Sequence, residues 1–297
     1  MNPVIEISSL IRYFGDLAAV NGLYISVETG VIYGFLGPNG SGKTTTIRMM
    51  MNFIKPNTGK IKILGDELKW GNFSFLKNIG YLPGEVRLPN HLSGKKLLDY
   101  WEALSGRKAD RRDLLLERLS LTGEDLHKKT GEYSRGMKQK LAIVGAIQCS
   151  PELLILDEPT EGLDPLVKHS FLELLKELKQ TGTSIFFSSH ILSEVEQIAD
   201  IAGIIRKGKL VANSSIEEFR HHGGKKVEIL FADEIHAQKF LEKCVCNCTR
   251  VKNKVNLFLE KNINSLFEVL VDFEIVDINI SNPTLEDIFL EYYEAVD

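Results

Sequence analysis

A short apolar run, Val31–Leu36, leads directly into the glycine-rich segment Gly37–Thr44, and apolar residues at helical spacing follow between Ile47 and Ile54. This order predicts a buried strand, a tight loop and an amphipathic helix. Main-chain N–H groups can surround a phosphate only where the backbone comes very close to it, and glycine permits that approach. The positive end of the following helix points at the same charge. We therefore expect a phosphate site at this junction.

Two glycines, a lysine and a hydroxyl residue occur in this segment at the spacing of a phosphate-binding P-loop. Lys43 is expected to bind the β- and γ-phosphates of a nucleotide, and the Thr44 hydroxyl to hold Mg²⁺. An ordinary glycine turn is the alternative, and the strand before the loop and the helix after it argue against that. The pattern predicts ATP or GTP binding, through Gly37, Pro38, Asn39, Gly40, Ser41, Gly42, Lys43, Thr44 and Thr45.

A second apolar run, Leu153–Leu156, ends on two carboxylates, Asp157 and Glu158. A buried strand would hold both side chains rigidly beside the phosphate loop. Asp157 is placed to meet Mg²⁺ through water, and Glu158 to polarise the attacking water as a general base. Taken alone, such a pair is more typical of a solvated strand end. The presence of a P-loop in the same chain favours the catalytic interpretation.

The rest of the first two thirds of the chain predicts an α/β fold with a mainly parallel sheet. Ser184–Phe187 is another short buried strand, and Leu166–Leu178 before it has helical spacing. Alternating apolar residues within Val4–Val27 indicate antiparallel strands beside the main sheet. Residues 89–148 lack such strands and contain several helical stretches, which predicts a helical insertion. The expected fold class is a P-loop NTPase core with an antiparallel β subdomain and a helical subdomain.

The segment His221–Lys226 breaks these patterns and is the predicted domain boundary. An ATPase domain would then occupy residues 1–220, and a small accessory domain residues 225–297. The alternation of strands and helices in the second part indicates an α+β sandwich. We interpret the pair His221 and His222 as part of a solvated linker rather than as a metal site.

The segment Tyr133–Leu141 precedes a helical pattern and stands shortly before the carboxylate strand. It resembles the signature of the ABC (ATP-binding cassette) family, usually Leu-Ser-Gly-Gly-Gln, with Ser134 and Gly136 kept. The resemblance implies that the signature of one protomer lies against the γ-phosphate bound by the other, so that Ser134 and a helix N-terminus complete the nucleotide site. An ordinary N-cap serine is the alternative. Three residues depart from the commonest pattern: Tyr133, Arg135 and Met137.

Two further segments follow in the order that this family shows. Glu161–Pro165 resembles the family's D-loop, with Glu161 in place of the usual serine and Asp164 retained. His190 follows the strand that ends at Phe187, as the family's switch histidine does. The resemblance implies that His190 contacts the γ-phosphate and holds the attacking water, which makes it a catalytic residue together with Glu158.

Arg12–Gly15 resembles the family's adenine-stacking loop, and its register favours Phe14 as the stacking ring. Tyr13 is the alternative, and either ring could instead pack into the core. At the family's Q-loop the match is weakest, because Gly84 occupies the usual glutamine position with Glu85 next to it. Either Glu85 substitutes in sensing Mg²⁺ and water, or coupling to the partner subunit works differently.

The resemblance covers residues 4–218 and implies an ATP-hydrolysing subunit of an ABC transporter, with ATP and Mg²⁺ as cofactors. Its partners would be separate transmembrane permease subunits and a second cassette, either an identical copy or a paralogue. The segment Pro283–Glu291 resembles, more loosely, the accessory domain of bacterial exporter-type cassettes, which favours export. The net charge of -4 does not suggest nucleic-acid binding.

Two other functions are alternatives to the transporter subunit. A soluble ABC ATPase of translation or DNA repair usually carries two cassettes or a long coiled coil, and neither pattern is visible. A P-loop kinase would leave the signature and His190 unexplained. No apolar stretch reaches the roughly 18 residues that a spanning helix needs, and Met1–Ile7 lacks the features of a secretory signal. We expect a cytoplasmic protein, peripheral on the inner face of the membrane.

The four cysteines do not follow a familiar zinc spacing. Cys244, Cys246 and Cys248 alternate and would share one face of a strand, and Cys149 stands alone. We interpret all four as reduced, partly buried thiols.

Overall fold

The computed structural model describes residues 3–222, 224–243, 248–259, 263–282 and 284–287 of the chain. The chain divides into two compact units, one within Met1–Asn213 and one within Ser214–Asp297. Each unit has its own hydrophobic core. The two units are therefore described separately.

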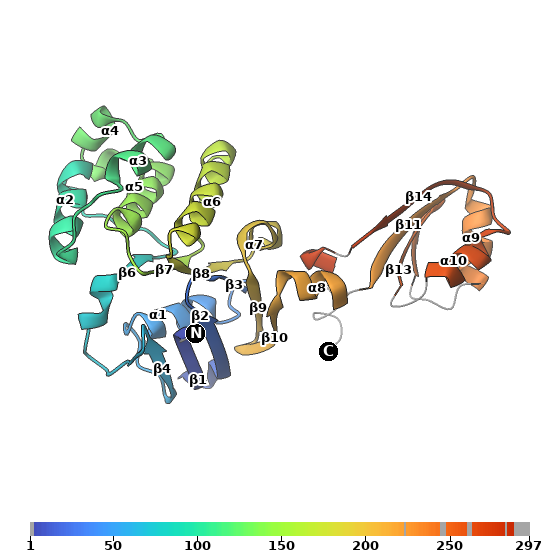
Figure 1. Cartoon of the computed structure of the whole chain (residues 1–297), viewed down its shortest axis with the longest axis horizontal. Coiled ribbons are helices and arrows are strands. Elements are labelled where there is room, and N and C mark those ends of the chain that lie inside the picture. The colour runs from blue at the N-terminus through green and yellow to red at the C-terminus, as the bar shows by residue number, and fades with distance from the viewer. Residues whose placement is uncertain (1–2, 223, 244–247, 260–262, 283, 288–297) are drawn as a thin grey trace. The chain divides into compact units, whose positions relative to one another are not determined.

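A six-stranded sheet forms the centre of the first unit, in the order β10-β9-β3-β8-β7-β6 (Figure 1). The five strands from β9 to β6 pair in parallel, which confirms the predicted mainly parallel α/β sheet. Every residue of β3, β7 and β8 is buried, and this explains their continuous apolar sequences. The strands are β3 (Ile32–Leu36), β6 (Ile79–Leu82), β7 (Leu153–Asp157), β8 (Ser184–Ser189), β9 (Ile201–Arg206) and β10 (Lys209–Ser215).

A second, antiparallel sheet of the same unit has the order β2-β1-β4-β5. Its two long strands pair along most of their length, with bulges near Ser9 and Tyr13. The core cluster of the unit joins this sheet to the central one through side chains of α1, among them Ile47 and Met50. The elements are β1 (Pro3–Phe14), β2 (Leu17–Glu28), α1 (Lys43–Met50), β4 (Thr58–Ile63) and β5 (Asp66–Glu67). The helix that begins at the P-loop is thus packed from two sides.

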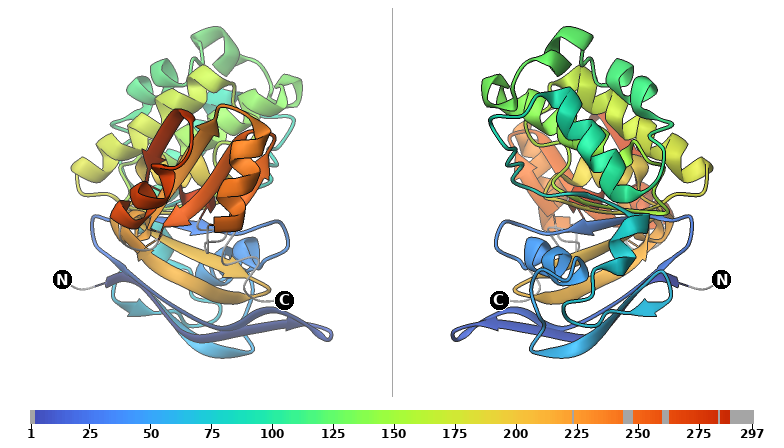
Figure 2. Two further views of the ribbon diagram at one scale, coloured as in Figure 1. Left: turned by 90° about the vertical axis from the view of Figure 1, so that its right-hand side faces the viewer. Right: turned by 90° about the vertical axis from the view of Figure 1, so that its left-hand side faces the viewer.

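The remaining helices of the first unit gather to one side of its strands, as Figures 1 and 2 show for α2 to α6. Four of them begin at a side-chain cap: Ser93 for α2, Thr122 for α4, Ser134 for α5 and Asp164 for α6. The ring of Trp101 on α2 lies so close to Gly145 on α5 that a Cβ there would meet it at 2.3 Å. The helices are α2 (Gly94–Ser105), α3 (Arg112–Arg118), α4 (Gly123–His127), α5 (Arg135–Ile147), α6 (Pro165–Gln180) and α7 (Leu192–Ile198), with 3-10 turns η1 (Ser74–Asn78) and η2 (Thr130–Glu132).

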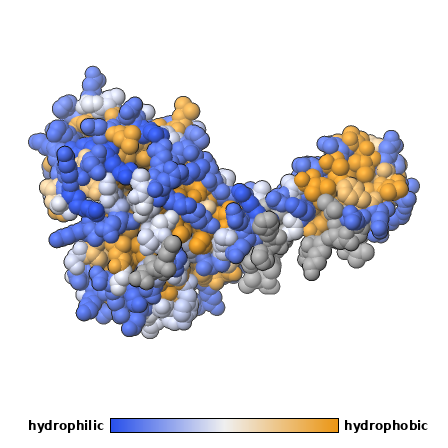
Figure 3. Space-filling view, in the orientation of Figure 1, coloured by the Kyte–Doolittle hydropathy of each residue, from blue (hydrophilic) through white to orange (hydrophobic). Residues whose placement is uncertain are grey.

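The second unit contains a four-stranded antiparallel sheet in the order β12-β13-β11-β14. Its core joins alternate residues of β11 to side chains of α9 and α10, so both helices cover one face of the sheet. Exposed apolar side chains such as Val271 and Val276 remain, and Figure 3 shows a broad apolar area on the side of this unit turned toward the viewer. The elements are α8 (Ile216–His222), β11 (Lys225–Phe231), α9 (Glu234–Lys243), β12 (Cys248–Val251), β13 (Lys254–Leu259), α10 (Ile263–Leu270) and β14 (Ile275–Ser281).

The predicted boundary segment His221–Lys226 includes the end of α8 and the start of β11, and it begins a few residues after the division between the compact units. Among the helices that the structure describes, none combines the length and the apolar character that a membrane crossing requires. Cys149 and Cys248 are half-buried, whereas Cys244 and Cys246 lie outside the described residues. The described part of the chain contains no cluster of His, Cys, Asp and Glu side chains suited to a metal ion.

Candidate nucleotide site

The predicted phosphate loop connects the buried end of β3 to the first turn of α1. Gly40 and Gly42 have φ angles of 79° and 113°, which side-chain-bearing residues rarely adopt. A Cβ on Gly42 would also meet the carbonyl oxygen of Ala19 at 2.4 Å. Lys43 folds back over the loop, where its Nζ donates to the carbonyl oxygens of Gly37 at 2.6 Å and Pro38 at 3.2 Å. The loop therefore closes around a buried ammonium group.

The two predicted carboxylates lie where β7 ends, beside the end of β8. Asp157 is 1% exposed, and its Oδ1 accepts a hydrogen bond of 2.6 Å from the hydroxyl of Ser188. Its Oδ2 is buried without a hydrogen-bond partner. The main-chain N–H of Glu158 donates to both the hydroxyl and the carbonyl oxygen of Ser188, at 3.1 and 3.2 Å. Pairing of β7 with β8 thus fixes both carboxylates.

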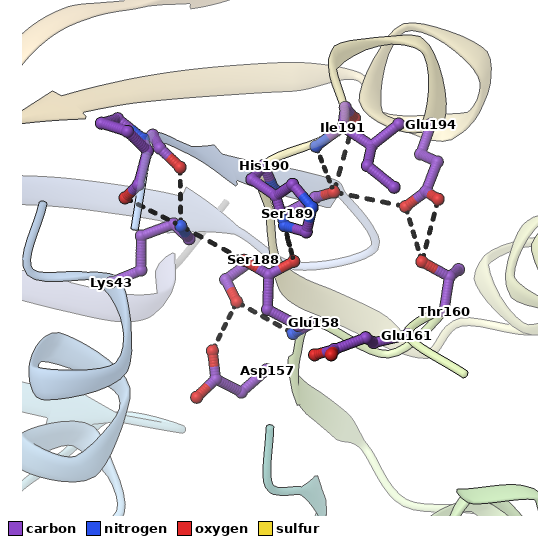
Figure 4. Close-up of polar contacts among 12 residues, drawn as sticks. Lys43, Asp157, Glu158, Thr160, Glu161, Ser188, Ser189, His190, Ile191 and Glu194 are labelled. Carbon is purple, nitrogen blue, oxygen red and sulfur yellow. Dashed lines mark hydrogen bonds and ion pairs between the residues drawn. The ribbon is translucent and has the colours of Figure 1, made fainter. Parts of the chain in front are cut away.

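The Glu158 side chain connects the phosphate loop to the predicted switch histidine (Figure 4). Its Oε1 lies 3.2 Å from Lys43 Nζ, and its Oε2 lies 2.8 Å from His190 Nδ1. The main-chain N–H of His190 also donates to Oε2 at 3.3 Å. Glu158 itself has a φ of 48°, a strained backbone conformation of the kind that clusters at functional sites. The structure therefore brings together Lys43, Glu158 and His190 from three separate segments.

A cavity of about 530 Å³ opens beside these residues, lined by Thr44, Arg48, Tyr81, Pro83, Gly84, Glu85, Arg87, Asp157, Glu158 and Glu161. Burial and the nearby Asp157 carboxylate raise the pKa of Tyr81 to about 12, so its phenol stays protonated. The unpartnered Oδ2 of Asp157 and the Thr44 hydroxyl are the kind of oxygen ligands that Mg²⁺ prefers. The residues present therefore fit a divalent cation.

The signature segment begins α5, where the Ser134 hydroxyl accepts from the N–H of Met137 at 3.2 Å. This helix contacts the D-loop and the residues just before it in the same chain: Arg135 forms an ion pair with Glu161, and Gln139 donates to the carbonyl oxygen of Pro159 at 2.9 Å. No hydrogen bond or ion pair within the described residues joins Ser134 to the phosphate loop. Within one chain, the predicted signature residues thus stay apart from the P-loop.

The predicted adenine-stacking segment, Arg12–Gly15, contains two aromatic rings that the structure does not distinguish. Phe14 and Tyr13 are about equally exposed, at 45% and 44%, so neither ring is buried in the core. The guanidinium of Arg12 lies 4.7 Å from the centre of the Phe14 ring. The choice of Phe14 stays a prediction.

At the Q-loop, a Cβ on Gly84 would lie 3.1 Å from the unpartnered Oδ2 of Asp157. Glu85 next to it is exposed and forms an ion pair of 2.9 Å with Arg87. Gly84 thus has no side chain where the family usually has a glutamine amide. The neighbouring Glu85 lines the 530 Å³ cavity.

A larger apolar cavity of about 580 Å³ lies next to the first and shares Tyr81, Pro83 and Arg87 with it. Its other walls come mainly from η1, α2 and α5, including Trp101 and Leu104.

Three polar residues that motif spacing did not single out belong to the same site. The Ser188 hydroxyl donates to the Asp157 carboxylate, and the Ser189 hydroxyl accepts from the N–H of Ile191 in the turn at His190. Glu194 on α7 accepts from the Thr160 hydroxyl. Ser188 and Ser189 stand in the segment that ends on the switch histidine, so their position carried a signal. Glu194 gave none, because two of its partners, Thr160 and Lys168, come from distant parts of the sequence.

The chain is similar to known proteins over nearly its whole length. Residues 20–161 match the family described as "ABC transporter". The chain is 36% identical over 303 residues to the bacitracin transport ATP-binding protein BcrA of Bacillus licheniformis, covering 98% of this chain and 97% of that one. It is 33% identical over 299 residues to the ABC transporter ATP-binding protein YcbN of Bacillus subtilis, again covering 98% and 97%.

Solved structures show the same fold. A structure of an ATP-binding subunit of an ABC transporter, 30% identical, superposes with a TM-score of 0.68 over 73% of this chain and 92% of its own. A dimeric cassette, MJ0796 bound to ADP and Pi, superposes with a TM-score of 0.65 at 20% identity, over 71% and 98%. Together with the curated relatives, these matches establish that the chain belongs to the ABC transporter family as one of its ATP-binding, ATP-hydrolysing proteins.

Proposed function

We propose that this chain is the motor of a transporter whose membrane-spanning parts are separate polypeptides, and that it acts from the inner face of the membrane. The observation that carries the proposal is that Glu158, which lines the 530 Å³ cavity, contacts both Lys43 and His190. This arrangement joins a phosphate-binding cation, a general base and a group able to sense the γ-phosphate. A soluble ABC ATPase without a transporter is the alternative function.

In the proposed site, Lys43 and the main-chain N–H groups of Gly37–Thr45 bind the phosphates of ATP. Thr44 and Asp157 would hold Mg²⁺, which would neutralise charge on the phosphate oxygens. Glu158 takes a proton from the attacking water, and His190 keeps that water and the γ-phosphate in line. Phe14 stacks on the adenine. Support for the metal comes from the buried, unpartnered Oδ2 of Asp157.

The active form is proposed to be a head-to-tail dimer of cassettes that closes over two Mg·ATP molecules. Ser134 and Gly136 begin a helix whose positive end suits a phosphate, yet they make no contact with the P-loop of their own chain among the described hydrogen bonds. A second copy, or a paralogue, would present them to the γ-phosphate. Hydrolysis would then remove those contacts and open the dimer.

The membrane subunit is proposed to dock in the 580 Å³ apolar cavity. This cavity shares Tyr81, Pro83 and Arg87 with the nucleotide cavity. A conformational change at the phosphates would therefore also change the walls of the apolar cavity. Leu104, which is 61% exposed on its rim, offers a test. The variant Leu104→Glu should bind ATP normally yet no longer co-purify with the membrane protein; retained co-purification would contradict this docking site.

Export is the direction we propose, since the C-terminal segment resembles that of exporter-type cassettes. The similarity to a bacitracin transport protein over nearly the whole chain makes bacitracin the first substrate to test. Cells that lack the protein should accumulate more bacitracin than cells that contain it, and equal accumulation would count against this substrate.

The variant Glu158→Gln tests the motor directly. It keeps the size of the side chain but cannot accept a proton, so it should bind ATP with near-normal affinity and lose most of its hydrolysis, roughly 100-fold or more. It should also accumulate as a closed dimer in size-exclusion chromatography with ATP. Glu173→Gln, on the exposed surface of α6, is the control and should hydrolyse ATP normally. Normal turnover by Glu158→Gln would remove Glu158 from its role.

A further inference from the structure

Glu194 is a buried carboxylate outside the residues that handle the phosphate. It lies in the first turn of α7 and is only 2% exposed. Both of its oxygens accept from the Thr160 hydroxyl, at 2.9 and 2.8 Å, and Oε2 also accepts from the Ser189 hydroxyl at 3.2 Å. Lys168 forms an ion pair with Oε1. A charge this deep is held only with several partners, and these three supply them.

The partners of Glu194 come from the two ends of the D-loop and from the strand end before His190, and Figure 4 shows two of them, Thr160 and Ser189. Thr160 stands two residues after Glu158, and Lys168 lies in the first turns of α6, so the two enclose the D-loop from both ends. Ser189 immediately precedes His190. One carboxylate thus ties both ends of the D-loop to the strand end that carries the switch histidine.

The hydroxyl of Ser189 transmits this contact to His190. The Ser189 hydroxyl donates its proton to Glu194, and its oxygen accepts at the same time from the N–H of Ile191 at 2.9 Å. These two bonds hold the main chain on either side of His190. Without the carboxylate, the hydroxyl loses a strong acceptor and the turn loses its fixed geometry.

We propose that Glu194 is a positioning residue that keeps the D-loop and His190 moving as one body. The inference rests on the proposed function, in which the D-loop faces the second cassette and His190 faces the γ-phosphate. A change at the dimer interface would then reach His190 through Thr160, Glu194 and Ser189.

Steady-state kinetics of Glu194→Gln give the first test. The amide keeps the side chain's size, but its NH₂ group cannot accept from both hydroxyls and Lys168 as the carboxylate does. Turnover should fall about 10- to 100-fold, as is usual when an outer partner of a catalytic group is lost. The KM for ATP should change less than about twofold, because Lys43 does not contact Glu194. Turnover within about twofold of the parent would overturn the proposal.

A double-mutant cycle in the parent chain provides a test that leaves the buried charge in place, and the Glu194→Ala background serves as its reference. Thr160→Val and Ser189→Ala each remove one hydroxyl that binds Glu194. Their effects on kcat should be strongly non-additive in the parent chain, because both act through one carboxylate, and should become independent in a Glu194→Ala background. Independent effects in the parent chain would overturn the proposal.

Two controls separate the possible failures. Glu173→Gln, which removes an exposed partner of Lys176 on α6, should leave kcat and the cycle unchanged. Glu158→Gln is measured in parallel. Normal turnover by that variant would reject the proposed function itself, whereas its inactivity together with an additive cycle would reject only the role of Glu194.

Discussion

Glu158 contacts Lys43, so an incoming nucleotide must compete with Glu158 for this ammonium group. Its Oε1 is 3.2 Å from Lys43 Nζ, and that ammonium also donates to two carbonyl oxygens of the P-loop. Phosphate oxygens would offer Lys43 a more highly charged partner. On the proposed mechanism, ATP therefore draws Lys43 away from Glu158, and the base becomes free to accept a proton from water only when nucleotide is bound.

The variant Lys43→Ala should bind ATP about 100-fold more weakly, since hydrogen bonds to charged groups contribute about 1.5–3 kcal/mol each. Isothermal titration calorimetry with ATP measures this directly. Lys60→Ala, which removes an exposed lysine paired with Glu67, is the control and should bind normally. Unchanged affinity of Lys43→Ala would contradict the phosphate cradle.

The sequence predicts a catalytic residue where the residues next to it in the chain indicate its role. Lys43 lies inside its motif, and Glu158 and His190 each follow an apolar strand, so local order was enough. The contact between Ser188 and Asp157 depends on the register of β7 with β8, which pairs these two residues. Glu194 depends in the same way on where α7 packs. No local pattern contains that information.

Among the elements, the short helix α4 depends on its first turn. The Thr122 hydroxyl accepts from the N–H of Asp125 and donates to its carboxylate, which in turn accepts from the N–H of Thr122. The hydrogen bond from Lys128, with those from Thr122, lowers the pKa of Asp125 to about 2 from 3.8. Because the folded-state pKa is depressed, this stabilisation is present above about pH 4 and is lost as pH falls toward 2.

Asp125→Asn should accordingly lower the free energy of unfolding by about 1 kcal/mol at pH 7, the usual contribution of a helix cap. The difference from the parent should shrink as the pH drops below about 4. Urea denaturation across this pH range measures it. Glu124→Gln alters the same turn without touching the cap, and an equal loss in that variant would contradict the assignment.

Gly80 shows how closely β6 and α5 pack. A Cβ at this position would meet the carbonyl oxygen of Ala146 at 2.1 Å and Leu154 Cδ2 at 2.5 Å. Gly80→Ala should therefore lower the free energy of unfolding by about 2 kcal/mol or more, because a backbone atom has to move. Gly123→Ala, at an open position in the first turn of α4, should be neutral or stabilising by up to about 1 kcal/mol. Equal midpoints in urea for both variants would contradict this view of the packing.

The long-range arrangement of elements was partly predictable. Apolar strands of five or six residues separated by helical patterns indicated the parallel sheet, because strands buried on both faces contain few polar residues. The strand order was not predictable from the same pattern. It places β3 between β8 and β9, and it thereby sets the P-loop beside His190.

For the whole molecule, the central consequence of the proposed function is that one chain would hold only part of a nucleotide site. Thr44 of the P-loop and both carboxylates line one cavity, and Glu158 contacts His190. The signature serine instead caps α5, whose Arg135 pairs with Glu161 of the D-loop. A second copy would complete the site, and ATP would then join the two subunits. The second compact unit has a separate core, and the division of the chain into domains 1–220 and 225–297 stays a prediction.

The structure of the Glu158→Gln variant with Mg·ATP measures this consequence most directly. The account predicts a γ-phosphate contacted by Lys43 of one chain and by Ser134 of the second, with the Gly136 main chain close by. A nucleotide that touches a single chain, with Ser134 of the neighbouring chain turned elsewhere, would contradict it.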